Sequence, residues 1–145
     1  MSVKERWIKT KLINYNTDEA IASMLPTLQR DMRIVAAYLF GSRLNKTGSS
    51  ESDIDIAVYT TDDFSWEDRH LLYGELSKTI HSDRLDLIWL NESEPILTFE
   101  VIKNGKLIFY RNAGMLNDFE LKAKKIYYDH VIYLEKHRRY RGFGL

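Results

Sequence analysis

Two aspartates separated by a single residue, Asp53 and Asp55, are the first side chains in this sequence whose spacing suggests chemistry. They lie at the start of an apolar segment, 54–59, that is typical of a β-strand, and residues two apart in a strand project to the same face. Two carboxylates held side by side repel each other unless a cation lies between them. Because Mg²⁺ prefers oxygen ligands, the pair predicts a magnesium site.

A third aspartate, Asp86, interrupts another apolar segment, 85–90, that also predicts a strand. Its neighbours Leu85 and Leu87 are expected on the opposite face of that strand. If the two strands lie side by side, Asp86 approaches the same cation. Three carboxylates together with substrate phosphates are suitable ligands for a two-metal displacement at phosphorus.

The Gly41-Ser42 step and the following Arg43 provide groups that suit a phosphate chain. Glycine after the apolar segment 34–40 lets the backbone approach a phosphate. The Ser42 hydroxyl and nearby N–H groups can donate to phosphate oxygens, and Arg43 adds a guanidinium. Each feature alone has an ordinary explanation, as a turn, as polarity at a loop end or as an edge residue. Their joint occurrence favours a site for phosphoryl-type transfer.

The elements that must position these residues alternate between helix and strand. Helices are expected at 16–30, 65–80, 95–104 and 118–138, and strands at 34–40, 54–59, 85–90 and 106–110. This alternation predicts an α/β class with a small central mixed sheet flanked by helices. We expect a single domain over 1–145, in which 118–145 forms a C-terminal helix and a basic tail.

The composition excludes several other classes. Lys and Arg together number 21, as do Asp and Glu, so the net charge gives no indication of direct nucleic-acid binding. The basic tail 136–141 is interpreted as a solvated helix end, where cations are favoured. The chain has no cysteine, which excludes disulfides and thiolate metal sites. The N-terminus carries no signal-peptide pattern and the longest apolar run is too short to cross a bilayer, so we expect a cytoplasmic protein with no membrane partner.

At Gly41-Ser42, at Asp53-x-Asp55 and at Asp86 the sequence resembles the polymerase-β nucleotidyltransferase superfamily. It is most similar to the minimal nucleotidyltransferase (MNT) group, which includes antitoxins paired with HEPN-domain toxins, and it has the same ten residues between Gly-Ser and Asp-x-Asp. The resemblance implies the fold of that superfamily and Mg²⁺ as cofactor. It also implies ATP as substrate and transfer of AMP to a tyrosine of a HEPN RNase toxin, which is thereby neutralised.

Carried over to this sequence, the resemblance gives each motif residue a role. Asp53 and Asp55 are metal ligands, Asp86 is a metal ligand or the general base, and Gly41 and Ser42 hold the triphosphate. Many relatives have a second basic residue two positions after the Arg that follows Gly-Ser. This chain has Asn45 there, with Lys46 as the nearest substitute.

Two other functions fit parts of the same pattern. A nucleotidyltransferase that modifies a small molecule such as an aminoglycoside usually has a second domain for its acceptor, whereas only about 35 residues follow the last expected strand here. A non-catalytic antitoxin that silences its partner by contact alone has no need of three intact acids. Both features favour transfer to a protein.

Overall fold

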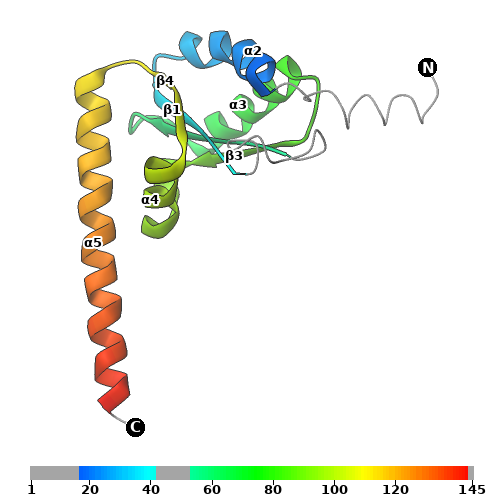
Figure 1. Ribbon diagram of the computed structural model, residues 1–145. Coiled ribbons are helices and arrows are strands. Elements are labelled where there is room, and N and C mark those ends of the chain that lie inside the picture. Colours follow the sequence, from blue (N-terminus) through cyan, green and yellow to red (C-terminus); the bar gives the residue numbers. More distant parts are fainter. Residues whose placement is uncertain (1–16, 42–52, 144–145) are drawn as a thin grey trace, which may run out of the picture.

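The computed structural model describes residues 17–41 and 53–143, which form a four-stranded sheet with helices on both faces (Figure 1). The strand order is β3-β2-β1-β4, with β1 antiparallel to both of its neighbours and β2 parallel to β3. The elements are α2 (Thr17–Arg30), β1 (Ile34–Phe40), β2 (Ile54–Thr60), α3 (Trp66–Thr79), β3 (Leu85–Trp89), the 3₁₀ helix η1 (Leu90–Glu92), α4 (Pro95–Asn104), β4 (Lys106–Tyr110) and α5 (Ala113–Phe143). The predicted α/β class and mixed sheet are confirmed.

The apolar strand β1 lies inside the sheet and is buried on both faces, as its unbroken apolar sequence predicts. On one face, side chains of the sheet pack with α2 and α3 around Met24, Leu28 and Leu76. On the other face, α4 and α5 cover the sheet with Val101 and Phe119. Apolar layers therefore cover both faces of the sheet. The layer formed with α4 and α5 lies on the face that carries the acidic residues.

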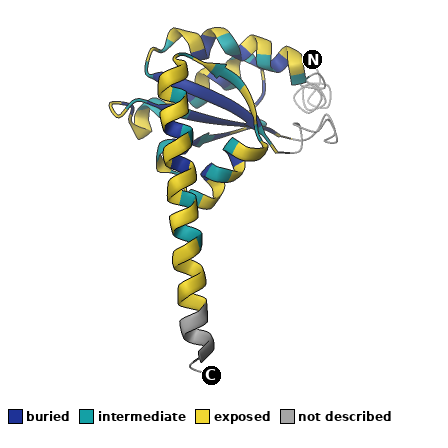
Figure 2. Ribbon diagram, turned by 60° about the vertical axis from the view of Figure 1, so that its left-hand side comes forward, coloured by how far each residue is buried: buried dark blue, intermediate teal, exposed yellow. Residues whose placement is uncertain are grey.

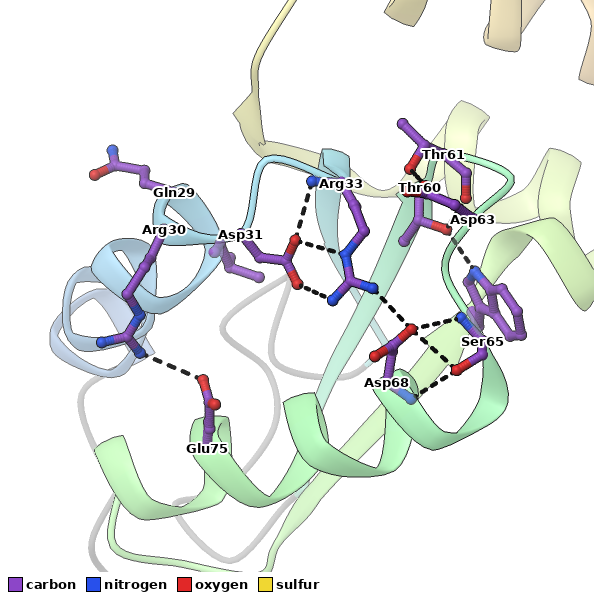
Figure 3. A network of polar contacts seen from close by, with 12 residues as sticks. Gln29, Arg30, Asp31, Arg33, Thr60, Thr61, Asp63, Ser65, Asp68 and Glu75 are labelled. Atoms are coloured by element: carbon purple, nitrogen blue, oxygen red, sulfur yellow. Dashed lines mark hydrogen bonds and ion pairs between the residues drawn. The ribbon is translucent and has the colours of Figure 1, made fainter.

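The start of α3 is fixed by a network around Arg33 (Figure 3). Ser65 and Asp68 form a capping box, in which the Ser65 Oγ accepts the Asp68 N–H and the Asp68 carboxylate accepts the Ser65 N–H. The Arg33 guanidinium donates to both Asp31 and Asp68, at 3.0 and 2.9 Å. Hydrogen bonds from Arg33 lower the pKa of Asp31, and those from Ser65 lower the pKa of Asp68. The network joins α2, β1 and α3 at one end of the sheet.

The last helix is longer than the pattern 118–138 predicts, because it begins at Ala113 and continues to Phe143. Asn112 starts it: its Oδ1 accepts the Met115 N–H and its carbonyl accepts the Leu116 N–H, both at 3.0 Å. Gly114 in the first turn weakens the helical pattern there, which hides this start in the sequence. The other bounds differ less: β2 extends to Thr60, and β3 ends before residue 90, which belongs to η1.

Only the first half of α5 packs on the sheet, and its second half extends past the rest of the molecule (Figures 1 and 2). Phe119 and Ala123 are buried, and Phe119 stacks on Tyr59 with ring centroids 3.9 Å apart. The Tyr38 hydroxyl donates to Glu120 at 3.1 Å. Among the described residues, none of the helices combines the length and apolar character that a membrane span requires.

Candidate active site

Asp55 and Asp86 are brought together by the pairing of β2 with β3. In this parallel pair Asp55 lies opposite Asp86, while on the other side of β2 Asp55 lies opposite Phe40 of β1. Residues opposite each other project to the same face of a sheet, so both carboxylates lie on the face that α4 and α5 cover. Ile54 and Leu85, one residue earlier, are buried on the other face. The strand alternation that the sequence predicts for the aspartates is therefore present, with the two strands adjacent.

Gly41 lies directly against the Asp55 carboxylate. Its φ is +84°, a left-handed conformation that glycine adopts without steric cost. A Cβ atom placed on Gly41 would fall 1.9 Å from Asp55 Oδ2, which is far inside van der Waals contact. Both the backbone conformation and the neighbouring carboxylate therefore require glycine at the end of β1.

The surroundings of Asp55 favour its neutral form. Burial, and after it the negative charges of Asp86 and Asp53, together raise the pKa of Asp55 to about 6. Its ordinary pKa is near 4. The charged form of Asp55 therefore costs free energy unless a cation compensates it, which is the property expected of a buried metal ligand.

Asp53 has a basic neighbour that sequence reasoning overlooks. Arg84 Nε lies 3.4 Å from Asp53 Oδ1, and both side chains are partly exposed. Arg84 precedes Asp86 by two residues, so the same alternation that identifies Asp86 also identifies Arg84 as a residue of this face. That signal was present in the sequence, and the site consequently contains a guanidinium beside its three carboxylates.

The acids match the donor chemistry of Mg²⁺, although they do not converge on one point. Within 17–41 and 53–143, no three acidic or imidazole side chains are close enough to bind a cation together. Asp55 faces Gly41, Asp53 faces Arg84, and Asp86 is exposed. All three offer carboxylate oxygens, and the raised pKa of Asp55 shows a cost that a divalent cation would relieve. By donor type and charge, the residues fit the metal.

The remaining predicted site residues, Ser42 and Arg43, lie outside the described residues, as do Asn45 and Lys46. Of the proposed phosphate-binding step, only Gly41 belongs to the part that the structure describes. Its position at the end of β1 places the start of that step beside Asp55.

Residues 23–114 match the family described as polymerase beta, nucleotidyltransferase. The chain belongs to that family. The matched segment runs from α2 into the first turn of α5 and contains the Gly41-Ser42 step and all three aspartates. Membership in the nucleotidyltransferase family therefore agrees with the acidic face that the strand pairing assembles.

Relatives within the nucleotidyltransferase family include a curated enzyme and solved complexes. The protein adenylyltransferase MntA of Shewanella oneidensis strain MR-1 is 36% identical over 88 residues, which is 61% of this chain and 60% of that protein. The match thus spans about three-fifths of the curated relative. A chain in a crystal structure of a toxin–antitoxin with AMP-PNP has 25% identity and a TM-score of 0.66, covering 87% of this chain and 98% of its own.

A further solved structure has the same fold. It contains the tri-AMPylated HEPN toxin of Shewanella oneidensis in complex with an MNT antitoxin, and its matching chain has 24% identity and a TM-score of 0.65. The match covers 87% of this chain and 98% of that chain. These matches cover more of this chain than the family segment 23–114 does.

Proposed function

We propose that this protein is an adenylyltransferase antitoxin that transfers AMP from ATP to a tyrosine of a cognate HEPN RNase toxin and thereby neutralises it. The observation that carries the proposal is the pairing of Asp55 with Asp86 beside Gly41 in a member of the nucleotidyltransferase family. The similarity to MntA and to chains of toxin–antitoxin complexes supports the protein acceptor. ATP and a toxin RNase as reactants place the proposed reaction in the cytoplasm.

The proposed reaction forms one bond at phosphorus and breaks another. The tyrosine oxygen of the toxin attacks the α-phosphorus of ATP, the bond from that phosphorus to the bridging oxygen breaks, and pyrophosphate leaves. Asp86 accepts the phenolic proton or binds metal, since it is exposed on the acidic face where an acceptor can reach it. Gly41 and Ser42, with Arg43, hold the triphosphate.

Mg²⁺ would be held by Asp53, Asp55 and Asp86. When bound, it neutralises charge on the phosphates and polarises the α-phosphoryl group. Asp55 supplies the most buried of the three carboxylates, and Arg84 keeps Asp53 in a defined orientation at the edge of the site. The chain's own contribution is to hold these charges on one face.

An open site suits a protein acceptor. Asp53 and Asp86 are both exposed, so the acidic face is accessible from solvent. A cavity of about 340 Å³ lies around Tyr59 and Trp89, at the other end of β2 and β3. A docked protein would present its own tyrosine to this exposed face.

Intact mass spectrometry of the toxin tests the proposal. The chain is co-expressed with its proposed HEPN toxin, and each transferred AMP is expected to add about 329 Da to the toxin, the mass of AMP less one water. Asp86→Asn should abolish the added mass while the chain stays folded. Asp62→Asn, which changes an exposed aspartate just beyond the far end of β2, is the matched control and should leave transfer intact.

The alternatives give different outcomes in the same experiment. An unmodified toxin that is neutralised equally by wild type and Asp86→Asn would identify a binding antitoxin. AMP appearing on an aminoglycoside instead of the toxin would identify a small-molecule enzyme. Either result would overturn the proposal.

A further inference from the structure

A small cavity opens directly beside Gly41, on the face of the sheet that carries the acids. Its volume is about 170 Å³. Phe40 and Gly41 form one wall, and Leu97 and Glu100 of α4 belong to the opposite wall. Because Phe40 lies opposite Asp55 across the β1–β2 pair, the cavity begins next to the most buried acid of the site.

The end of α4 is held against β1 by Gly105. Its N–H donates to the Val101 carbonyl at 2.7 Å. A Cβ atom there would fall 2.3 Å from the Val101 oxygen and 3.2 Å from the Leu39 oxygen. Only glycine permits this close approach, which fixes the last turn of α4, including Asn104, beside the end of β1.

Among the described residues, Glu100 is the one charged side chain that lines this cavity, and Asn104 sets its orientation. Asn104 Nδ2 donates to Glu100 Oε2 at 2.8 Å, one helical turn further on. The contact leaves Glu100 Oε1 and the other lone pairs of the carboxylate available to accept hydrogen bonds. A carboxylate repels phosphate, so the part of a nucleotide that enters here must be a donor of hydrogen bonds and must carry no negative charge.

We propose that this cavity is the ribose subsite of the enzyme, in which Glu100 accepts hydrogen bonds from the 2′- and 3′-hydroxyl groups of the bound nucleotide. The inference rests on the proposed function, in which the α-phosphate lies at Asp53, Asp55 and Asp86. Ribose is joined to that phosphate through its 5′-oxygen, so it is the unit that can enter the cavity beside Gly41. Phe40 and Leu97 provide apolar contact for the carbon face of the sugar, and Asn104 acts as a positioning residue for Glu100.

Titration calorimetry with Mg²⁺ and two nucleotides tests this assignment. AMP-PNP and its 2′-deoxy analogue are titrated into the full chain, and the wild type should bind the ribonucleotide about 10-fold more tightly, as expected for a lost hydrogen bond to a charged group. Glu100→Ala should bind the two within about 2-fold of each other. It should bind the deoxy analogue less tightly than wild type does, because the hydrogen bond from the 3′-hydroxyl is lost with the carboxylate. Asn104→Ala should reduce the discrimination only in part, because Glu100 remains.

Glu67→Ala is the matched control, since Glu67 is an exposed glutamate in the first turn of α3 on the opposite face of the sheet. It should keep the full discrimination. If Glu100→Ala keeps it too, or loses affinity for both nucleotides equally, the ribose assignment is overturned. If the wild type already binds the two nucleotides equally well, only the ribose assignment is overturned. If the wild type binds neither nucleotide, the proposed function is overturned as well.

Discussion

Asp55 carries its charge in surroundings that favour the neutral carboxyl. Its pKa of about 6 in the folded chain lies above the value of 3.8 expected when the chain is unfolded. The folded state therefore binds more protons between these values, and stability falls as pH rises from 4 to 6. Above pH 6 the ionised Asp55 carboxylate lowers the free energy of unfolding by its full amount. For a half-buried group after solvent screening, that amount is on the order of 1–2 kcal/mol.

Asp55→Asn should therefore stabilise the metal-free chain at pH 7.5 while abolishing Mg²⁺-dependent nucleotide binding. The gain, about 1–2 kcal/mol in urea unfolding, should disappear at pH 4, where the wild-type carboxyl is already protonated. Asp86→Asn, which removes only the neighbouring charge, should stabilise less. An Asp55→Asn variant that is less stable than wild type at pH 7.5 would contradict the assigned cost.

Gly41 is the second residue whose identity the site requires. Gly41→Ala places a side chain in a left-handed conformation, which costs about 1–2 kcal/mol, and forces the Asp55 carboxylate to move. We expect lower stability and loss of nucleotide binding. The double variant Gly41→Ala/Asp55→Ala should recover the steric part of the stability loss, so the two substitutions should be less than additive in a double-mutant cycle. Strict additivity would show that Asp55 is not the group in contact.

Alternation in short strands carries much of the information about this site. Asp53 and Asp55 could be placed on one face from spacing alone, because residues two apart in a strand share a side, whereas Asp86 joins them only if its strand lies beside theirs. That β3 lies beside β2 depends on α3 as a crossover between them, and the strand order depends on contacts across the chain, which no local spacing records. Glu100 lies on a helix and carries no such signal.

At the level of elements, local start signals predict helix bounds well where they are strong. Ser65 with Asp68 gives the start of α3, and Pro95 with Gly105 gives both ends of α4. The start of α5 at Ala113 was missed because Asn112 is followed by Gly114, a poor helix former. Contacts between elements are harder to predict from the sequence than the ends of helices are.

Arg111 illustrates such a contact between elements. It follows β4, and its guanidinium donates to backbone carbonyls at the end of α2 and the start of β1: those of Gln29 at 2.9 Å and of Asp31 and Ile34 at 3.0 Å. These carbonyls belong to residues about 80 positions earlier in the chain. Arg111 thus caps the C-terminus of α2 and fastens it to the edge strand of the sheet.

Arg111→Lys should destabilise the chain by about 2 kcal/mol, because a lysine ammonium cannot reach several carbonyls in the fixed geometry of a guanidinium. Urea unfolding followed by circular dichroism measures the loss. Arg30→Lys is the control: Arg30 forms an exposed ion pair with Glu75 at 3.3 Å, and its replacement should change stability by less than about 0.5 kcal/mol. Equal effects of the two substitutions would mean that Arg111 does not fasten α2.

On the scale of the whole molecule, α5 joins a packed body to a solvent-exposed extension. Its 31 residues span about 46 Å at 1.5 Å per residue. Phe119 and Ala123 bury the first half against the sheet, whereas Ile132, Tyr133 and Leu134 are 43–64% exposed in the second half. A helix without tertiary packing is marginal in water at this length, so the two halves should differ in stability although the backbone is continuous.

Hydrogen exchange of the free chain should therefore divide α5 in two. Amides around Phe119 to Ala123 should exchange as slowly as those of β1, because they open only with the body, while amides from Ile132 onward should exchange faster by at least about 100-fold through local fraying. Dilution serves as the control, since fraying within one chain does not depend on concentration. Uniformly slow exchange along α5 would mean that another chain covers its second half, and protection that is lost on dilution would identify a second copy of this protein as that cover.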